Sequence, residues 1–195
     1  MDQSSIIKKN LNAAISLKQD VLNDSDIISE INNITQKIIA CYQSGHKVLF
    51  CGNGGSAADA QHLAAELSGR YYYDRPPLSS EALHVNTSYL TAVANDYSYE
   101  LIYARLLQAI GNKGDILIAL STSGNSSNVI KAIEQARKNE MTIVSMTGAT
   151  GGKMKDISDY TICIPSSDTP RIQECHMLIG HTICEIVESS LFPQS

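Results

Sequence analysis

The strongest constraint on the fold is an alternation that begins at Lys47, where short apolar runs of strand length alternate with longer segments of helical periodicity. The apolar runs cover residues 48–51, 82–85, 116–120, 143–146 and 160–164. Helical patterns cover residues 57–67, 100–109, 129–138 and 172–187. Strands joined by helices pair in parallel, and both faces of a parallel sheet must be buried. The sequence therefore predicts an α/β fold, a three-layer sandwich with a five-stranded parallel sheet flanked by helices.

The first 44 residues differ from the rest, because they contain neither glycine nor proline. An apolar stripe with spacings of three and four predicts helix there, clearest at Ile27, Ile28, Ile31, Ile34, Ile38, Ile39 and Tyr42. The break at Asn23-Asp24-Ser25 supplies cap residues, so we expect two helices before the first strand. This N-terminal extension, residues 1–44, packs either on its own domain or on a second subunit, and the sequence does not decide between them.

Length and composition exclude several classes of protein. A chain of 195 residues fits a single domain, 1–195. The net charge is −5 and no basic run exceeds two residues, so we expect no nucleic-acid partner. No stretch approaches the 18 or so apolar residues that span a bilayer, and none resembles a secretion signal, so we expect no membrane partner. Five cysteines without C-x-x-C spacing fit a reducing compartment. We therefore expect a cytoplasmic protein.

A glycine-rich loop, Gly52-Asn53-Gly54-Gly55-Ser56, follows the first predicted strand and leads into an alanine-rich helix. Backbone N–H groups at such a helix start can bind an anion. The loop is a weak match to the dinucleotide fingerprint, which also needs an acid at the end of the next strand, and no Gly-Lys-Thr/Ser follows to make a Walker loop. A tight turn without a ligand is the alternative interpretation.

A second loop, residues 121–127, carries five hydroxyl groups in seven positions and again lies between a predicted strand and a predicted helix. Hydroxyls and free N–H groups at a helix start can satisfy the terminal oxygens of a monophosphate without a lysine. Ligands of open parallel sheets bind at the carboxyl ends of the strands, where both loops are expected. The pair of loops favours a small phosphorylated ligand, such as a sugar phosphate.

His62 and Glu66 are four residues apart on the predicted helix 57–67, so both side chains lie on one face. This is the spacing of metal ligands, and it is also the spacing of a solvated surface pair. His181 lies in an apolar stretch of the last predicted helix, where a histidine is more often a core residue than a ligand. Thr169-Pro170 looks like the N-cap and first residue of that helix.

Four motifs in order make the chain resemble the phosphoheptose isomerases, a family with the sugar isomerase (SIS) fold. They are the stretch Cys-Gly-Asn-Gly-Gly-Ser-Ala-Ala-Asp-Ala-Gln-His-x3-Glu at 51–66, Thr-Ala-Val-Ala-Asn-Asp at 91–96, Ser-Thr-Ser-Gly-Asn-Ser at 121–126, and Arg-Ile-Gln-Glu at 171–174 with His181. The resemblance covers essentially the whole chain. It implies a single SIS-type domain. It also implies the reaction of this family, which converts sedoheptulose 7-phosphate to D-glycero-D-manno-heptose 7-phosphate in the biosynthesis of ADP-heptose and the lipopolysaccharide core.

The same resemblance implies a homotetramer and one zinc ion per subunit, held by His62, Glu66, Gln173 and His181. It implies substrate contacts at Asn53, Gly54, Gly55, Glu66, Asn95, Asp96, Ser121, Thr122, Ser123, Ser126 and Gln173, to which the glycine-rich loop adds Ser56. Gln173 and His181 are eight residues apart, about 12 Å along a helix. We expect long side chains, or a helix that begins near Gln173, to close that distance.

The implied reaction moves a proton between two carbons through an enediolate, which needs a base, an acid and stabilisation of an oxyanion. Glu66 and His181 are the natural catalytic pair, and the sequence does not show which takes the first proton. A partner-binding SIS protein, the DnaA initiator-associating protein, also resembles the chain through residues 52–56 and 171–174. That group lacks the equivalents of Glu66 and His181, which favours the isomerase. Another SIS sugar-phosphate isomerase or regulator is a third possibility.

Overall fold

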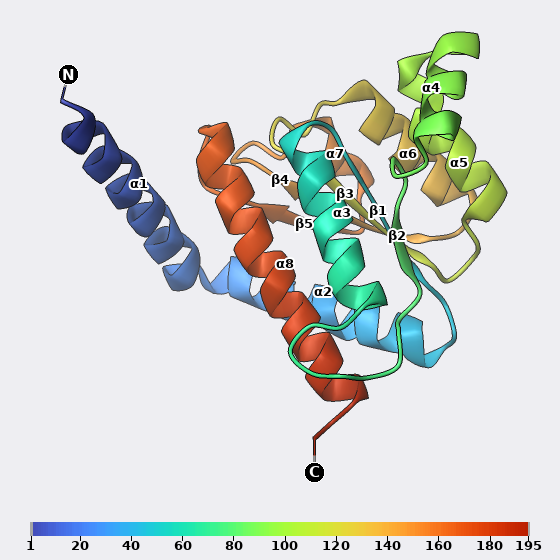
Figure 1. Ribbon diagram of the computed structural model, residues 1–195, viewed down its shortest axis with the longest axis horizontal. Coiled ribbons are helices and arrows are strands. Elements are labelled where there is room, and N and C mark those ends of the chain that lie inside the picture. Colours follow the sequence, from blue (N-terminus) through green and yellow to red (C-terminus); the bar gives the residue numbers. More distant parts are fainter. Residues whose placement is uncertain (1, 195) are drawn as a thin grey trace.

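The computed structural model describes residues 2–194, and its centre is one five-stranded sheet with the order β2-β1-β3-β4-β5, parallel throughout (Figure 1). The strands are β1 (Val48–Gly52), β2 (Ser80–Ala82), β3 (Ile116–Ser121), β4 (Thr142–Thr147) and β5 (Tyr160–Cys163). All residues of β1 and β3 are buried, which explains their uninterrupted apolar runs. The predicted α/β sandwich with a five-stranded parallel sheet is confirmed.

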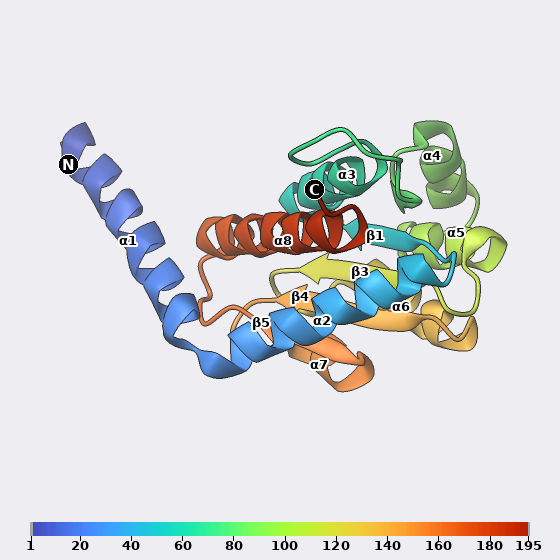
Figure 2. The ribbon, with the colours of Figure 1, turned by 90° about the horizontal axis from the view of Figure 1, so that it is seen from below.

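Helices cover both faces of the sheet, and the strand residues alternate between two cores. Phe50 and Ile118 face one core, together with α2 (Ser25–Gln43), α3 (Gly55–Ser68) and α8 (Thr169–Leu191). Leu49 and Leu117 face the other core, with α5 (Ile102–Ile110), α6 (Ser127–Lys138) and α7 (Gly152–Ile157). Two further helical segments, α4 (Thr87–Asp96) and the 3-10 turn η1 (Tyr99–Leu101), precede α5. Helices α3 and α8 lie side by side on the first face (Figures 1 and 2).

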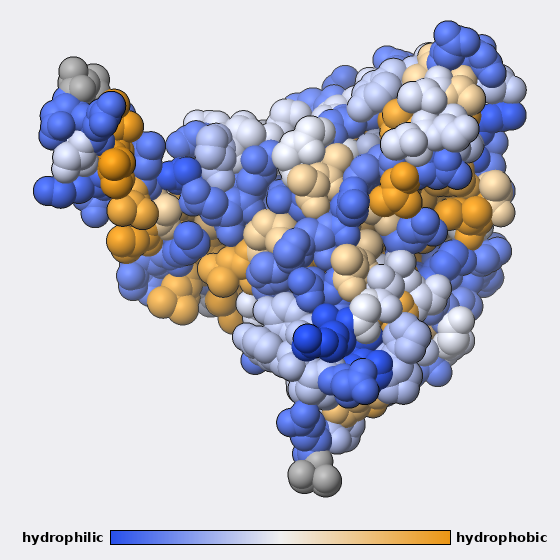
Figure 3. Space-filling model, viewed as in Figure 1, coloured by the Kyte–Doolittle hydropathy of each residue, from blue (hydrophilic) through white to orange (hydrophobic). Residues whose placement is uncertain are grey.

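The N-terminal extension consists of two helices, as predicted, because Asp24 separates α1 (Gln3–Asn23) from α2. The Asp24 carboxylate accepts hydrogen bonds from the backbone N–H groups of Asp26 and Ile27, both at 3.0 Å. Helix α2 packs on the sheet, whereas α1 projects away from it (Figures 1 and 2). Apolar side chains stay exposed along one side of α1 (Figure 3): Ile6, Ile7, Leu11, Ile15 and Leu22.

The bounds of the second strand and the N-cap of the last helix were predicted wrongly, and two helices were missed. The second strand is Ser80–Ala82 rather than 82–85: Leu83 still donates to the Phe50 carbonyl, but the Val85 N–H turns back to Ala82. An edge strand that exposes Glu81 carries no apolar run, and so the run after it was misread. The N-cap of α8 is Asp168, one residue before the predicted Thr169. Helices α4 and α7 had not been predicted.

Within residues 2–194, no helix combines the length and the apolar character that crossing a bilayer requires.

Candidate active site

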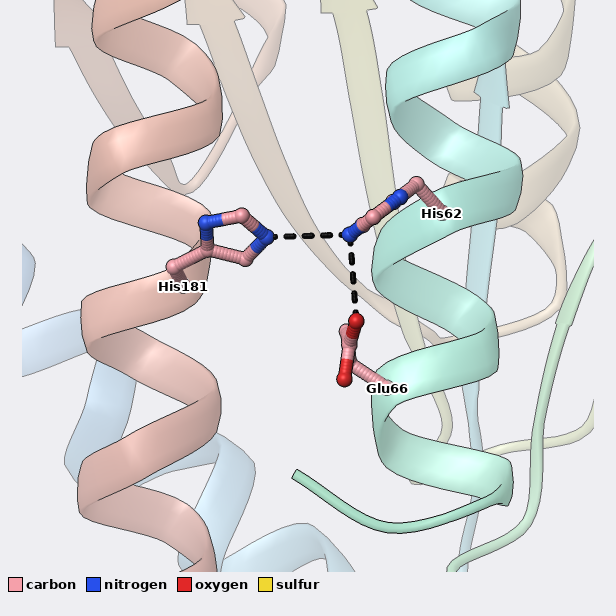
Figure 4. A group of neighbouring side chains, drawn as sticks. All are labelled: His62, Glu66 and His181. Atoms are coloured by element: carbon pink, nitrogen blue, oxygen red, sulfur yellow. Dashed lines mark hydrogen bonds and ion pairs between the residues drawn. The ribbon is translucent and has the colours of Figure 1, made fainter. Parts of the chain in front are cut away.

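Three side chains with ligand or acid–base chemistry meet between α3 and α8. His62 and Glu66 project from one face of α3, and His181 projects toward them from α8 (Figure 4). The His62 Nε2 atom lies 3.0 Å from His181 Nε2 and 3.0 Å from Glu66 Oε1. One ligand atom from each of the three residues lies within 4.8 Å of the others. His62 and Glu66 are therefore more than an isolated helical pair, and His181 is not part of the core.

Close packing of the two helices brings these residues together. Gly180, next to His181, has no side chain, and a Cβ atom there would lie 2.5 Å from two side-chain carbons of Leu63. Leu63 in turn is the neighbour of His62 and is buried. The small residue on α8 thus lets the backbone of α8 approach α3 at the height of the three side chains.

The protons of this group cannot satisfy both short contacts at once. His62 Nε2 either donates its hydrogen or accepts one, yet it faces an imidazole nitrogen and a carboxylate oxygen at equal distance. A divalent cation would accept electron pairs from all three atoms together. Two imidazoles and a carboxylate are a donor set that suits zinc. The chemistry of the group therefore fits a metal ion.

The two predicted anion loops meet in a single cavity of about 290 Å³ near the start of α8. Its lining comes from both loops, from the end of β3 and from α8: Asn53, Gly55, Ser56, Leu120, Ser121, Thr122, Ser123, Ser126, Thr169 and Gln173. Ser121 Oγ lies 2.9 Å from Ser126 Oγ and 3.3 Å from Ser123 Oγ. Neither Gly54, the N-cap of α3, nor Ser126, the N-cap of α6, caps its helix with a side chain. Two helix starts and several hydroxyls thus surround one cavity, as an anion site requires.

Residues that the sequence did not indicate hold the glycine-rich loop. Asn53 and Asn128 exchange two amide hydrogen bonds of 2.8 Å, and the Tyr99 hydroxyl donates to Asn53 Oδ1 at 3.1 Å. The Tyr103 hydroxyl donates to the Gly52 carbonyl. Asn128 is buried in the first turn of α6, directly after the hydroxyl-rich loop, so it ties the two loops together. No sequence motif marks these partners, because they lie far along the chain from residue 53.

Gln173 lies between the two regions. It lines the 290 Å³ cavity and also a second cavity of about 530 Å³, to which His181 and Asp59 contribute. Its amide packs against the backbone of Gly55, where a Cβ would lie 2.5 Å from Gln173 Nε2. Because α8 begins at Thr169, Gln173 is already inside the helix rather than at its start, and the link from Gln173 to the three-residue group stays a prediction.

Asn95 and Asp96 lie apart from these cavities. They occupy the last turn of α4, are exposed, and the Asn95 amide donates to the Asp96 carboxylate at 2.9 Å. Neither residue contributes to the lining of the two cavities described above. Their predicted contact with substrate stays a prediction.

Two further titratable groups near the site differ in role. Burial raises the pKa of Asp59 to about 6, although nearby His62 lowers it, and one Asp59 oxygen is buried without a hydrogen-bond partner. Burial lowers the pKa of His176 to about 4, so this ring is neutral, and we infer that its Nε2 donates to the Thr147 carbonyl at 3.1 Å. Asp59 thus adds an acid beside the site, whereas His176 fastens α8 to the end of β4.

The fold and these two regions define a parallel α/β protein in which the cavity lined by the two predicted anion loops, called the anion cavity below, lies next to the group of His62, Glu66 and His181. Residues 12–148 match the model of the SIS domain family. The chain is 51% identical over 186 residues to a phosphoheptose isomerase of Aneurinibacillus thermoaerophilus, covering 95% of this chain and 94% of the relative. It is 50% identical over 189 residues to phosphoheptose isomerase 2 of Campylobacter jejuni, covering 97% and 94%.

A solved structure has the same fold over the same length. The phosphoheptose isomerase of Neisseria gonorrhoeae superposes with a TM-score of 0.91 at 35% identity, covering 96% of this chain and 100% of that one. The chain therefore belongs to the SIS domain family and, within it, to the phosphoheptose isomerases.

Proposed function

We propose that this protein is a sugar-phosphate isomerase that converts sedoheptulose 7-phosphate to D-glycero-D-manno-heptose 7-phosphate in heptose biosynthesis. One observation carries the proposal: the acid–base group of His62, Glu66 and His181 lies on the same two helices, α3 and α8, that help to line the anion cavity. A phosphate held by the loops leaves the other end of an open-chain sugar free to extend along these helices. Membership in the phosphoheptose isomerases gives the same reaction.

Different residues have different roles in the proposed reaction. The hydroxyls of Ser121, Ser123 and Ser126, with the N–H groups at the starts of α3 and α6, bind the phosphate. Of Glu66 and His181, one moves the proton between the two carbons and the other moves the proton between the two oxygens of the enediolate, because a carboxylate and an imidazole can each take up and release a proton. His62, Glu66 and His181, with Gln173, would hold one zinc ion, which would polarise the carbonyl and hydroxyl oxygens of the substrate.

The proposed reaction can be tested by incubating the metal-replete protein with sedoheptulose 7-phosphate and following the products by NMR. We expect the signals of an aldoheptose phosphate to appear and, in deuterium oxide, deuterium to enter at the carbon that exchanges its proton. If the folded, metal-replete protein produced no aldose, the proposal would be wrong. The partner-binding SIS protein is not favoured, since both Glu66 and His181 are present and are brought together.

Loss of hydroxyls from the anion cavity should weaken binding of the phosphorylated substrate and leave the proton-transfer groups in place. For the double variant Ser123→Ala/Ser126→Ala we expect KM to rise by about tenfold or more with a smaller change in kcat. Steady-state kinetics measure both, and Ser189→Ala, an exposed serine near the end of α8, serves as the control. An unchanged KM in the double variant would mean that the phosphate lies elsewhere, with residues 52–56 the next candidate.

A homotetramer is part of the proposal, and α1 supports it. This helix exposes a row of large apolar side chains, with Ile15 63% exposed, and buries Leu17 and Val21. A single chain also leaves the side chain of His62 51% exposed, although proton transfer is favoured in a site from which water is excluded. A second copy that packs on α1 and near α3 would cover both. A cytoplasmic location also belongs to the proposal, and the five free cysteines support it.

Light scattering at micromolar concentration should give the mass of four chains. The double variant Leu11→Glu/Ile15→Glu should dissociate the assembly, because it places charges in the apolar row of α1. The control is Lys8→Glu/Lys9→Glu, which changes charge on the same helix without altering that row. A wild-type protein that is monomeric at this concentration would contradict the proposed tetramer.

A further inference from the structure

A buried ion pair connects the loop after α3 to the last part of α8. Arg75 is 8% exposed and Glu188 is 1% exposed, and Arg75 Nε donates to Glu188 Oε1 at 3.0 Å. The Glu188 carboxylate also accepts hydrogen bonds from the backbone N–H groups of Tyr71 at 2.8 Å and Tyr72 at 2.7 Å. Both oxygens of the carboxylate thus accept hydrogen bonds within the protein, two at Oε1 and one at Oε2.

The guanidinium of Arg75 caps the end of α3. Its Nη1 donates to the carbonyls of Leu67 at 2.7 Å and Gly69 at 3.1 Å, and its Nη2 donates to the carbonyl of Glu66 at 2.9 Å. Helix ends leave carbonyls without partners, and a buried cation there satisfies them. Arg75 therefore touches the backbone of a proposed catalytic residue, while its ion-pair partner is on the helix that carries His181.

Glu188 stays charged in this environment. Burial raises its pKa, but the N–H groups of Tyr71 and Tyr72 and the hydrogen bond and charge of Arg75 outweigh burial, so the pKa lies below its usual value. A buried ion pair of this kind adds little net stability compared with apolar residues of similar size, whereas it fixes the relative position of the elements it joins. The ion pair lies close to His181 in the structure. Glu188 follows His181 by two helical turns, and the Tyr71 ring lies 5.8 Å from the His181 ring.

We propose that Arg75 and Glu188 are positioning residues for the isomerase reaction: together they fix the end of α3 against α8 and so fix Glu66 and His62 relative to His181. The inference rests on the proposed function, because it assigns a task to the same three side chains. Neither Arg75 nor Glu188 belongs to the three-residue group or lines the anion cavity, so their effect on the chemistry must pass through the helices.

The test uses Glu188→Gln, which keeps the size of the side chain but removes the charge and turns an amide toward two backbone N–H groups. We expect kcat to fall by about 10- to 100-fold, since small displacements of reacting groups cost that much. KM should change by less than about threefold, because the anion cavity lies at the other end of α3. Zinc affinity, measured by competition with a chromophoric chelator, should fall by about tenfold or more.

The imidazole signals of the histidines give a readout that needs neither substrate nor metal. In Glu188→Gln we expect the NMR signals of His62 and His181 to shift, while those of His84, beyond the carboxyl end of β2, stay in place. Leu107→Ala is the control for lost stability, because Leu107 is fully buried in the core on the other face of the sheet. It should lower the melting temperature without moving the signals of His62 and His181, the zinc affinity or the kcat.

If Glu188→Gln does not fold, the same measurements are made on Arg75→Lys. Lysine keeps the charge but cannot reach every carbonyl that the guanidinium caps. Unshifted His62 and His181 signals in the folded variant would overturn the inference, as would equal losses in Leu107→Ala. An inactive wild type would instead contradict the proposed function, and the imidazole signals would still decide whether Arg75 and Glu188 position the three side chains.

Discussion

Glu66→Gln and His181→Gln should each lower kcat by about two orders of magnitude or more while leaving the fold intact. Both side chains belong to the group between α3 and α8, and neither is in the fully buried core. A glutamine amide is similar in size to either side chain but cannot take up or release a proton in the reaction. General acid–base catalysis contributes about 10²- to 10⁴-fold, which sets the size of the expected loss.

The measurement is steady-state turnover of sedoheptulose 7-phosphate, with the metal content of each variant determined on the same sample. His46→Gln and Glu81→Gln make the same chemical changes outside the site, at the end of the strands opposite the loops and on the edge strand, and should retain wild-type kcat. Near-normal turnover of a metal-replete Glu66→Gln or His181→Gln protein would remove that residue from the mechanism.

The sheet and its two loops could be predicted because they depend on local patterns. Buried strands such as β3 produce continuous apolar runs, and the loops that follow them contain the turn residues and hydroxyls that the helix starts require. The spacing of His62 and Glu66 likewise follows from helical geometry alone. The bounds of β2 were predicted wrongly because an edge strand of three residues that exposes Glu81 leaves no apolar run.

The position of His181 could not be derived from such patterns. It reaches His62 across 119 residues, and the contact depends on how closely α8 packs on α3, which Gly180 and Leu63 determine. The same is true of Asn128, which holds Asn53 across 75 residues, and of Arg75, which pairs with Glu188 across 113 residues. In each case the partner is chosen by packing in three dimensions. The motif resemblance pointed to Glu66 and His181, whereas it gave no indication of Asn128 or the Arg75–Glu188 pair.

Zinc should raise the melting temperature of the wild-type protein by about 5–10 °C when it is present at about 100 times its dissociation constant. Two of the proposed ligands are on α3 and the others are on α8, so the complete site exists only in the folded chain. A ligand that binds the folded state alone stabilises it by about 2.7 kcal/mol at that concentration. For a chain of this size, each kcal/mol corresponds to a shift of about 2–4 °C.

His62→Ala should abolish this shift, because the His62 ring contacts both other members of the group, whereas His46→Ala should retain it. Lower pH should reduce the shift, since an imidazole must be neutral to bind a metal. Magnesium should not replace zinc, because it prefers oxygen ligands to imidazole nitrogens.

Metal analysis and activity after chelation then separate two cases. Loss of activity that zinc restores supports the proposed metal site, whereas full activity in zinc-free protein would leave Glu66 and His181 as an acid–base pair that works without a metal.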